Sequence, residues 1–213
     1  MIYSESILVC IAVPILITLI YVRGNARRYA AFFLVGMGIC LLSAYISGFA
    51  AYHNHMGEEW TSLYVSPSVE EVMKLLPLLF YLIFFLPENE KLFSSGTALA
   101  AGFATFENCC YILTSNAGSL TFILIRGLAV GVMHVVSILA LCLGLVLVRK
   151  FDAPKLPGVI GALSFSMSFH GLYNVLVSEP GLSTVVGYII PIVSALLLYV
   201  PYRRLIRPEK LED

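Results

Sequence analysis

The sequence has few charged side chains and no surplus of either sign. Only 12% of its 213 residues are charged, about half the share of an ordinary soluble domain, and 13 basic residues balance 13 acidic ones. Hydrophobic residues make up 59% of the chain, and the mean hydropathy is +0.90. These values exclude a disordered chain, a nucleic-acid-binding protein and an ordinary cytosolic domain. We therefore expect one compact domain whose partner is the lipid bilayer.

Several common catalytic and processing signals are also absent. The chain contains no HExxH sequence and no G-x-S-x-G sequence, which excludes a standard zincin helix and a nucleophile elbow. None of the five cysteines pairs with another at a spacing typical of zinc sites. The first apolar segment lacks the basic start and the small-residue cleavage site of a signal peptide, so we expect it to be retained.

Long apolar segments dominate what remains. An α-helix needs about 20 apolar residues to cross a hydrocarbon core of about 30 Å. Seven segments meet this requirement approximately: 4–22, 29–51, 67–87, 95–114, 119–148, 157–177 and 183–202. The alternating pattern of a membrane β-barrel is absent. The sequence therefore predicts an all-α polytopic membrane protein, a single transmembrane helical bundle over residues 1–213.

The basic residues predict the orientation of this bundle. Seven spans place on one side of the membrane the eleven basic residues that lie outside the segments: Arg23, Arg27, Arg28, Lys91, Arg149, Lys150, Lys155, Arg203, Arg204, Arg207 and Lys210. Cytoplasmic loops are enriched in lysine and arginine. We therefore expect a cytoplasmic C-terminus and an N-terminus outside. The loops near 52–66, 115–118 and 178–182 would then also lie outside.

Some ionisable side chains lie inside the predicted spans, where a charge costs about 2.5–3.5 kcal/mol. They are Glu70, Glu71, Lys74, Glu107, Arg126, His134 and His170. A rise of about 1.5 Å per residue places the glutamates and the histidines about 5–10 Å below the outer membrane surface. Four separate helices thus carry ionisable groups at one depth, which predicts a single site in the outer third of the bilayer.

Helical spacing adds supporting residues to this site. Glu70 and Lys74 are four residues apart, so they share a helix face and could pair. The same spacing recurs between Glu107 and Tyr111, and between His170 and Asn174. Asn108 adjoins Glu107, and Arg126, two turns before His134, could hold a carboxylate or a peptide carbonyl.

These residue types suit the hydrolysis of an amide. Carboxylates in a low-dielectric cleft cannot all be ionised together, so one could serve as a general base for water. Histidines could polarise the carbonyl or stabilise an oxyanion. The same set could instead hold one zinc ion, with Glu107, His134 and His170 as ligands and another glutamate as the base. The residues alone leave the two mechanisms open.

Two other classes of protein use buried polar residues. The cluster could be structural in a non-enzymatic scaffold or helix-binding protein. It could also belong to an ion- or proton-coupled transporter. A transport pathway should continue to the cytoplasmic side, and these groups are confined to one layer.

Four motifs on successive segments resemble a known family. They are Glu-Glu-x-x-Lys within Val69–Lys74, Phe-Glu-Asn-x-x-Tyr from Phe106 to Tyr111, Arg126 with His134, and His170-Gly171-Leu172-Tyr173-Asn174. In this order they resemble the PrsW family of intramembrane proteases, which is distantly similar to the type II CAAX prenyl proteases and to bacteriocin-processing membrane proteases. The resemblance covers a motif core of approximately 67–177.

The resemblance implies roles for these residues. Glu70 or Glu71 would activate water, with Glu107, His134 and His170 as catalytic partners or metal ligands. Lys74, Asn108, Tyr111, Arg126 and Asn174 would support them. The family resemblance also implies a membrane-anchored protein or peptide as substrate, cleavage near the outer surface, and a prokaryotic cytoplasmic membrane as the location.

Overall fold

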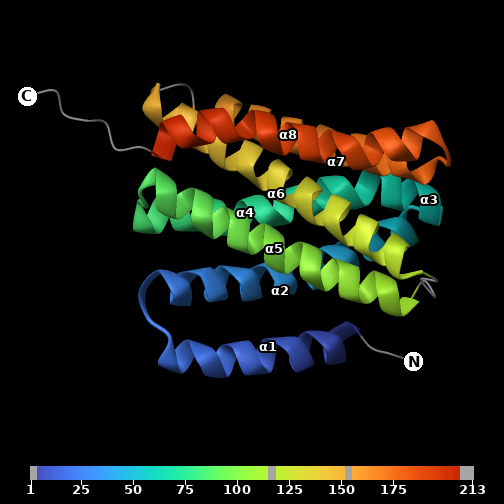
Figure 1. The fold of residues 1–213 in the computed structure, drawn as a ribbon, viewed down its shortest axis with the longest axis horizontal. Helices are drawn as coiled ribbons and strands as arrows, with labels where there is room; N and C mark the ends of the chain where they lie inside the picture. Colours follow the sequence, from blue (N-terminus) through green and yellow to red (C-terminus); the bar gives the residue numbers. More distant parts are fainter. Residues whose placement is uncertain (1–3, 115–118, 152–154, 207–213) are drawn as a thin grey trace, which may run out of the picture.

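The computed structural model describes residues 4–114, 119–151 and 155–206, and these ranges contain helices and no strand. Seven long helices lie side by side in a bundle (Figure 1): α1 (Ser4–Tyr21), α2 (Gly24–His53), α4 (Ser66–Phe85), α5 (Asn89–Thr114), α6 (Leu120–Lys150), α7 (Lys155–Ser178) and α8 (Leu182–Ile206). The all-α prediction is confirmed, and each of the seven expected segments is a helix. The predicted loop at 115–118 and the basic residues Arg207 and Lys210 lie outside the described residues.

Local sequence explains where several helices begin and end. Gly24, the first residue of α2, and Gly181, just before α8, adopt positive φ angles of 65° and 95°, a conformation that costs glycine little. Pro87 follows the end of α4 and cannot continue a helix. The Ser119 hydroxyl accepts a hydrogen bond from the backbone N–H of Phe122, which caps the start of α6.

The segment near 52–66 is more ordered than the sequence predicts. We expected a loop there, but α2 continues to His53, and two short elements follow: α3 (Glu58–Trp60) and the π-helix η1 (Thr61–Val65). Two glutamates in the first turn of α3 favour its start, since carboxylates stabilise a helix N-terminus. The prediction failed because an acidic, polar stretch of this kind is also typical of a solvated loop.

The arrangement in space places α6 at the centre. Helix α6 packs against α5, α7 and α8, and twelve of its residues are buried. Helix α1 lies at one edge of the bundle beside α2, and α8 lies at the opposite edge (Figure 1). The helices that carry the predicted site, α4 to α7, therefore pack around one another inside the bundle.

The outer surface suits a lipid environment. Four helices are long and apolar enough to cross a membrane: α2, α6, α7 and α8, the last over Leu182–Leu205. Many large apolar side chains point outward, including Phe84 and Leu196, each 70% exposed. The protein is thus an integral membrane protein, whereas the count of seven spans and the orientation stay predictions.

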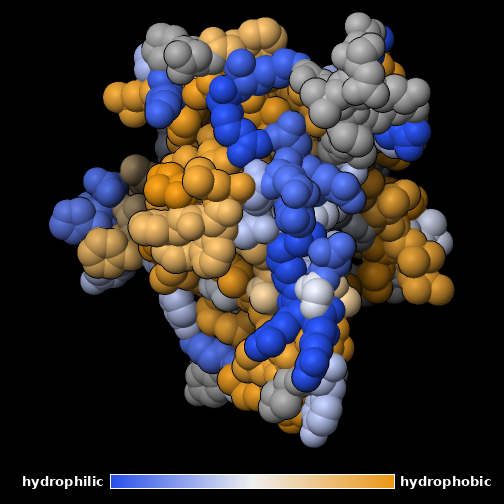
Figure 2. All heavy atoms as spheres, turned by 90° about the vertical axis from the view of Figure 1, so that its left-hand side faces the viewer, coloured by the Kyte–Doolittle hydropathy of each residue, from blue (hydrophilic) through white to orange (hydrophobic). Residues whose placement is uncertain are grey.

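Basic residues gather at one end of the bundle. The end includes the α1–α2 turn and the last turns of α6 and α8, and its described basic residues are Arg23, Arg27, Arg28, Lys91, Arg149, Lys150, Lys155, Arg203 and Arg204. Figure 2 shows this end, with hydrophilic residues across its middle and hydrophobic residues on either side. The helices thus place the basic residues together at one end, as the predicted orientation requires.

Two glycines bring the backbones of α2 and α5 into contact. A Cβ atom added at Gly36 would lie 2.0 Å from the carbonyl oxygen of Leu99, and one added at Gly102 would lie 1.9 Å from that of Phe33. Small residues at helix interfaces permit such close packing in membranes. This contact fixes the position of α5, which carries Glu107.

We predict that replacing either glycine by alanine weakens this contact. Gly36→Ala and Gly102→Ala should each lower the free energy of unfolding by about 1–3 kcal/mol, because a methyl group there must displace backbone. Thermal unfolding in detergent measures the effect. Gly38→Ala is the matched control on α2, since nothing lies within 4 Å of its added Cβ atom. Equal unfolding temperatures for the Gly36 and Gly38 variants would contradict the prediction.

Candidate active site

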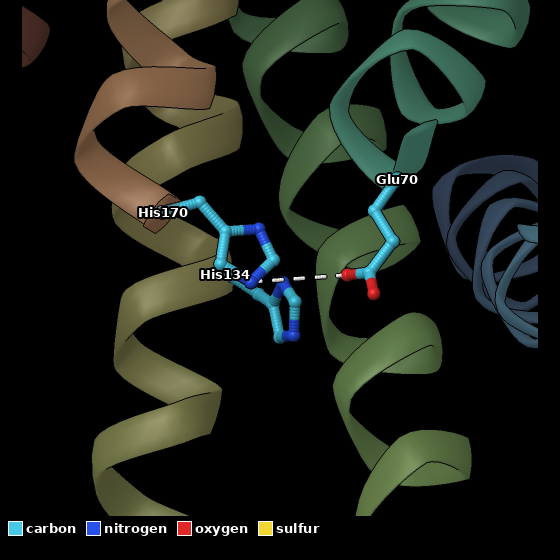
Figure 3. A group of neighbouring side chains, drawn as sticks. All are labelled: Glu70, His134 and His170. Carbon is cyan, nitrogen blue, oxygen red and sulfur yellow. Dashed lines mark ion pairs between the residues drawn. The ribbon is translucent and has the colours of Figure 1, made fainter. Parts of the chain in front are cut away.

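The predicted ionisable residues meet inside the bundle. They come from four helices: Glu70, Glu71 and Lys74 from α4, Glu107 from α5, His134 from α6 and His170 from α7. Figure 3 shows the side chains of Glu70, His134 and His170 pointing toward one another. The sequence predicted this meeting from helix depth alone.

Lys74 is the centre of the hydrogen-bond network. Its ammonium group is fully buried and donates to Glu71 Oε1 and to His134 Nδ1, each at 2.7 Å. The ring of Phe103 lies 4.2 Å from Nζ and adds a cation–π contact. A buried ion pair is stable only when its remaining polar atoms are bonded in this way.

The pairing of Lys74 differs from the sequence prediction. We expected Glu70, four residues before Lys74, as its partner, but the ion pair forms with Glu71, three residues before. Both spacings bring side chains together on a helix, so neighbouring helices decide between them. Glu71 points into the interior, where His170 Nδ1 also contacts it. Glu70 instead faces Nε2 of the same histidine.

The bond from Lys74 determines the tautomer that we assign to His134. An ammonium group only donates hydrogen bonds, so Nδ1 of His134 accepts and Nε2 carries the hydrogen. His134 Nε2 lies 2.6 Å from Glu107 Oε2 and donates to this carboxylate. Glu107 is 32% exposed and lies 3.9 Å from Arg126 Nη2.

Glu71 and Glu70 have opposite surroundings. Glu71 is fully buried and accepts from three donors, namely Lys74, His170 Nδ1 at 2.8 Å and the Ser166 hydroxyl at 2.7 Å. Glu70 Oε2 is buried without a hydrogen-bond partner among the described residues, 3.8 Å from His170 Nε2. Since His170 Nδ1 donates to Glu71, the Nε2 atom of the neutral ring presents a lone pair toward Glu70.

Sequence analysis missed two serines of this network. The Ser166 hydroxyl donates to Glu71 and lies 2.5 Å from the hydroxyl of Ser137, and both serines are fully buried. Their spacing offered a signal, because Ser166 precedes His170 by four residues and Ser137 follows His134 by three. Both serines therefore lie on the helix face of a predicted site residue.

The predicted supporting residues other than Lys74 lie toward the end of the bundle opposite the basic end. The guanidinium carbon of Arg126 lies 3.4 Å from the centre of the Tyr111 ring, and Asn174 donates to the backbone oxygen of Ser62 at 3.0 Å. Asn108 lines a small cavity of about 70 Å³ together with Arg126. These residues adjoin the cluster through Arg126, the neighbour of Glu107.

One group of side chains in the described part of the chain could hold a metal ion. Glu70, His134 and His170 each offer a ligand atom, and these atoms lie within 4.8 Å of one another. Two histidines and a glutamate form a common donor set of catalytic zinc. The sequence prediction had Glu107 as the third ligand, but in the structure Glu107 is bonded to His134 Nε2. The donor set fits zinc, provided that His134 gives up one of its two hydrogen bonds.

We predict that Lys74→Met strongly destabilises the protein. It leaves the buried carboxylate of Glu71 without a cation and His134 Nδ1 without a donor, which should cost about 3–5 kcal/mol in unfolding experiments in detergent. The double variant Glu71→Gln, Lys74→Met should be more stable than Lys74→Met alone, since it removes the unpaired charge.

The control for this prediction is an exposed ion pair at the other end of the bundle. Lys91 lies 3.2 Å from Glu88, with side chains 44% and 75% exposed. Lys91→Met should change the free energy of unfolding by less than about 1 kcal/mol. A similar loss for the Lys74 and Lys91 variants would show that the buried network contributes little.

Comparison with known proteins identifies the family. The profile described as PrsW family intramembrane metalloprotease matches residues 25–202, most of the chain. The match includes every ionisable residue of the site and the helices α4 to α7 that carry them. Searches of curated proteins and of solved structures found no significant match. The chain therefore belongs to the PrsW family of intramembrane metalloproteases and is a membrane-embedded peptidase.

Proposed function

We propose that the protein hydrolyses peptide bonds of membrane-anchored substrates in the outer third of the bilayer, with Glu70 as the general base. The contrast between the paired glutamates carries this proposal. Glu71 is occupied by three donors, whereas Glu70 Oε2 has no hydrogen-bond partner among the described residues and faces His170 Nε2. A base needs a free oxygen beside its substrate water, and Glu70 provides one.

In this mechanism, Glu70 carries a proton from the attacking water to the leaving amine. Glu70 accepts a proton from water as the water oxygen bonds to the peptide carbonyl carbon. The C–N bond then breaks, and Glu70 returns the proton to the leaving amine. His170 Nε2 faces the same space, and its ring is held in place by the bond from Nδ1 to Glu71.

The remaining residues hold this arrangement. Lys74 holds Glu71 and His134 together, and Glu107 fixes the other nitrogen of His134. A zinc ion bound by Glu70, His170 and the nitrogen of His134 that gives up its hydrogen bond would polarise the substrate carbonyl and lower the pKa of bound water. Binding through Glu70 would leave its second carboxylate oxygen for proton transfer.

The location in the outer third follows from the predicted orientation. Glu70 lies in the first turns of α4, and the described basic residues other than Lys74 and Arg126 lie at the opposite end of the bundle. If the basic end is cytoplasmic, as the positive-inside rule indicates, the site opens toward the outer leaflet. A prokaryotic plasma membrane and seven spans complete the proposal. The protease family favours this function over a scaffold or a transporter.

The first test separates the paired glutamates. Glu70→Gln should reduce proteolysis by about 10²–10⁴-fold, because an amide cannot accept the proton from water. It should leave unfolding in detergent nearly unchanged, since Glu70 Oε2 has no bond to lose. Glu71→Gln should reduce stability as well as proteolysis, because Lys74 then lacks its buried carboxylate partner.

The readout need not assume a substrate. New protein N-termini can be profiled in membranes that contain the wild-type chain or each variant. Glu59→Gln, on the exposed face of α3, is the control and should match the wild type. Wild-type cleavage products that persist with Glu70→Gln would refute the role of Glu70 as base.

The second test concerns the metal ligands. We expect about one zinc ion per purified chain, and we expect its loss in the His170→Ala and Glu70→Ala variants. Glu107→Ala should retain zinc if Glu70 is the third ligand and lose it if Glu107 is. Elemental analysis provides the measurement, with His55→Ala in the exposed segment after α2 as the control. Zinc retained by both His170→Ala and Glu70→Ala would contradict the proposed ligand set.

A further inference from the structure

A cavity lies beside the site at the outer ends of the helices. This outer pocket has a volume of about 250 Å³, and η1, α5, α6, α7 and α8 all contribute to its walls. The lining residues used in this argument are Ser62, Tyr111, Arg126, Tyr173, Asn174 and Tyr188. Its volume suits one or two amino-acid residues, since pockets for larger ligands begin near 300 Å³.

Two hydrogen-bond donors in the wall of this pocket lack partners. Arg126 Nε and the Tyr173 hydroxyl are both buried without a hydrogen bond among the described residues. Tyr173 is only 3% exposed, so its hydroxyl cannot obtain a partner from bulk solvent. Buried polar atoms normally have partners, so these two donors, in residues that line the pocket, call for an explanation, and an acceptor bound in the pocket would supply one.

Arg126 is the one charged residue among the described residues that line the pocket. Arg126 is held over the Tyr111 ring, and no residue that lines the pocket carries a carboxylate. The nearest carboxylate to Arg126 in the described network is Glu107, at 3.9 Å from Nη2. Glu107 already accepts a shorter bond of 2.6 Å from His134, so the guanidinium keeps capacity for a second anion.

The residues that line the outer pocket adjoin the proposed active site along two helices. Tyr173 and Asn174 follow His170 by three and four residues on α7, so they lie on the same face, about 5–6 Å further toward the outer surface. Arg126 connects to the cluster from the other side through Glu107. A peptide with its scissile bond near Glu70 would therefore place a neighbouring side chain in this pocket.

We propose that the outer pocket is a substrate subsite that binds an aspartate or glutamate side chain close to the scissile bond. The carboxylate would accept from Arg126 Nε and from the Tyr173 hydroxyl, which supplies both unpaired donors with an acceptor. This inference rests on the proposed proteolytic function, and it specifies a substrate class: membrane-anchored peptides with an acidic residue near the cleavage point.

The test measures binding separately from cleavage. The full-length Glu70→Gln protein is placed in nanodiscs of zwitterionic lipid. Five fluorescent decapeptides, uncharged except at one central position, carry Asp, Glu, Asn, Gln or Lys there. Fluorescence anisotropy should show Asp or Glu peptides binding about tenfold or more tightly than their amide counterparts, the size expected for hydrogen bonds to a charged group.

Substitutions in the pocket test whether its residues cause the preference for acidic peptides. Arg126→Gln should reduce the acid-to-amide ratio to about twofold or less, and Arg126→Lys should retain part of it because the charge remains. Tyr173→Phe should lower the ratio about threefold, since it removes one donor without changing the ring. Arg149→Gln, at the basic end of the bundle, is the matched control and should leave the ratio unchanged.

Several results would overturn the proposal of an acidic-residue subsite. Equal binding of acid and amide peptides, or no binding of any of the five, would overturn the proposal, and so would a preference that survives Arg126→Gln. Loss of the preference on adding anionic phospholipid would assign the pocket to a lipid headgroup instead. Because the protein in this assay carries Glu70→Gln, a positive result stands even if the cleavage test fails, and a negative result leaves the proteolytic proposal to its own test.

Discussion

The site depends on the hydrogen bonds that the buried ammonium group of Lys74 donates to Glu71 and His134. This ammonium group joins α4 to α6 through His134 and neutralises Glu71, which in turn holds His170 on α7. In an apolar bundle, none of these groups could be buried alone at a tolerable cost. The network therefore connects three helices. It also determines which nitrogen of each histidine donates a hydrogen bond and which accepts one.

This network gives the adjacent residues Glu70 and Glu71 different roles. Glu71 has a structural role, since both of its carboxylate oxygens accept hydrogen bonds, from Lys74, His170 and Ser166. Glu70, one position earlier, points about 100° away and escapes that network. Paired glutamates thus let one helix provide a fixed carboxylate for orientation and a free one for chemistry. Their different partners, rather than their shared residue type, explain why both are needed.

The sequence predicted the helices and the meeting of the site residues well, for a physical reason. Apolar length defines a membrane helix, and a constant rise per residue converts position into depth. Depth alone sufficed to bring Glu107, His134 and His170 into one layer. It could not choose between Glu70 and Glu71 as the partner of Lys74, because helices permit both spacings and the surrounding helices decide.

Other parts of the site carried weaker signals. Ser137 and Ser166 cost little to bury, so nothing in the composition marks them as members of a polar network. The grouping of Glu70, rather than Glu107, with the two histidines as possible metal ligands depends on side-chain direction across helices, which no spacing rule contains. The ordered elements after α2 were missed because Glu58 and Glu59 suit a solvated loop as well as a helix start.

The glycine contacts between α2 and α5 also bear on how a substrate enters. Backbones in direct contact at Gly36 and Gly102 leave no layer of side chains that could slide, and packed helices otherwise move past one another only slightly. Glu107 lies on the rigid partner α5, five residues beyond Gly102. A substrate that reaches Glu107 therefore meets a helix pair whose backbones are in contact, and this pair also supports η1, which contacts α2 as well as α4 and α7.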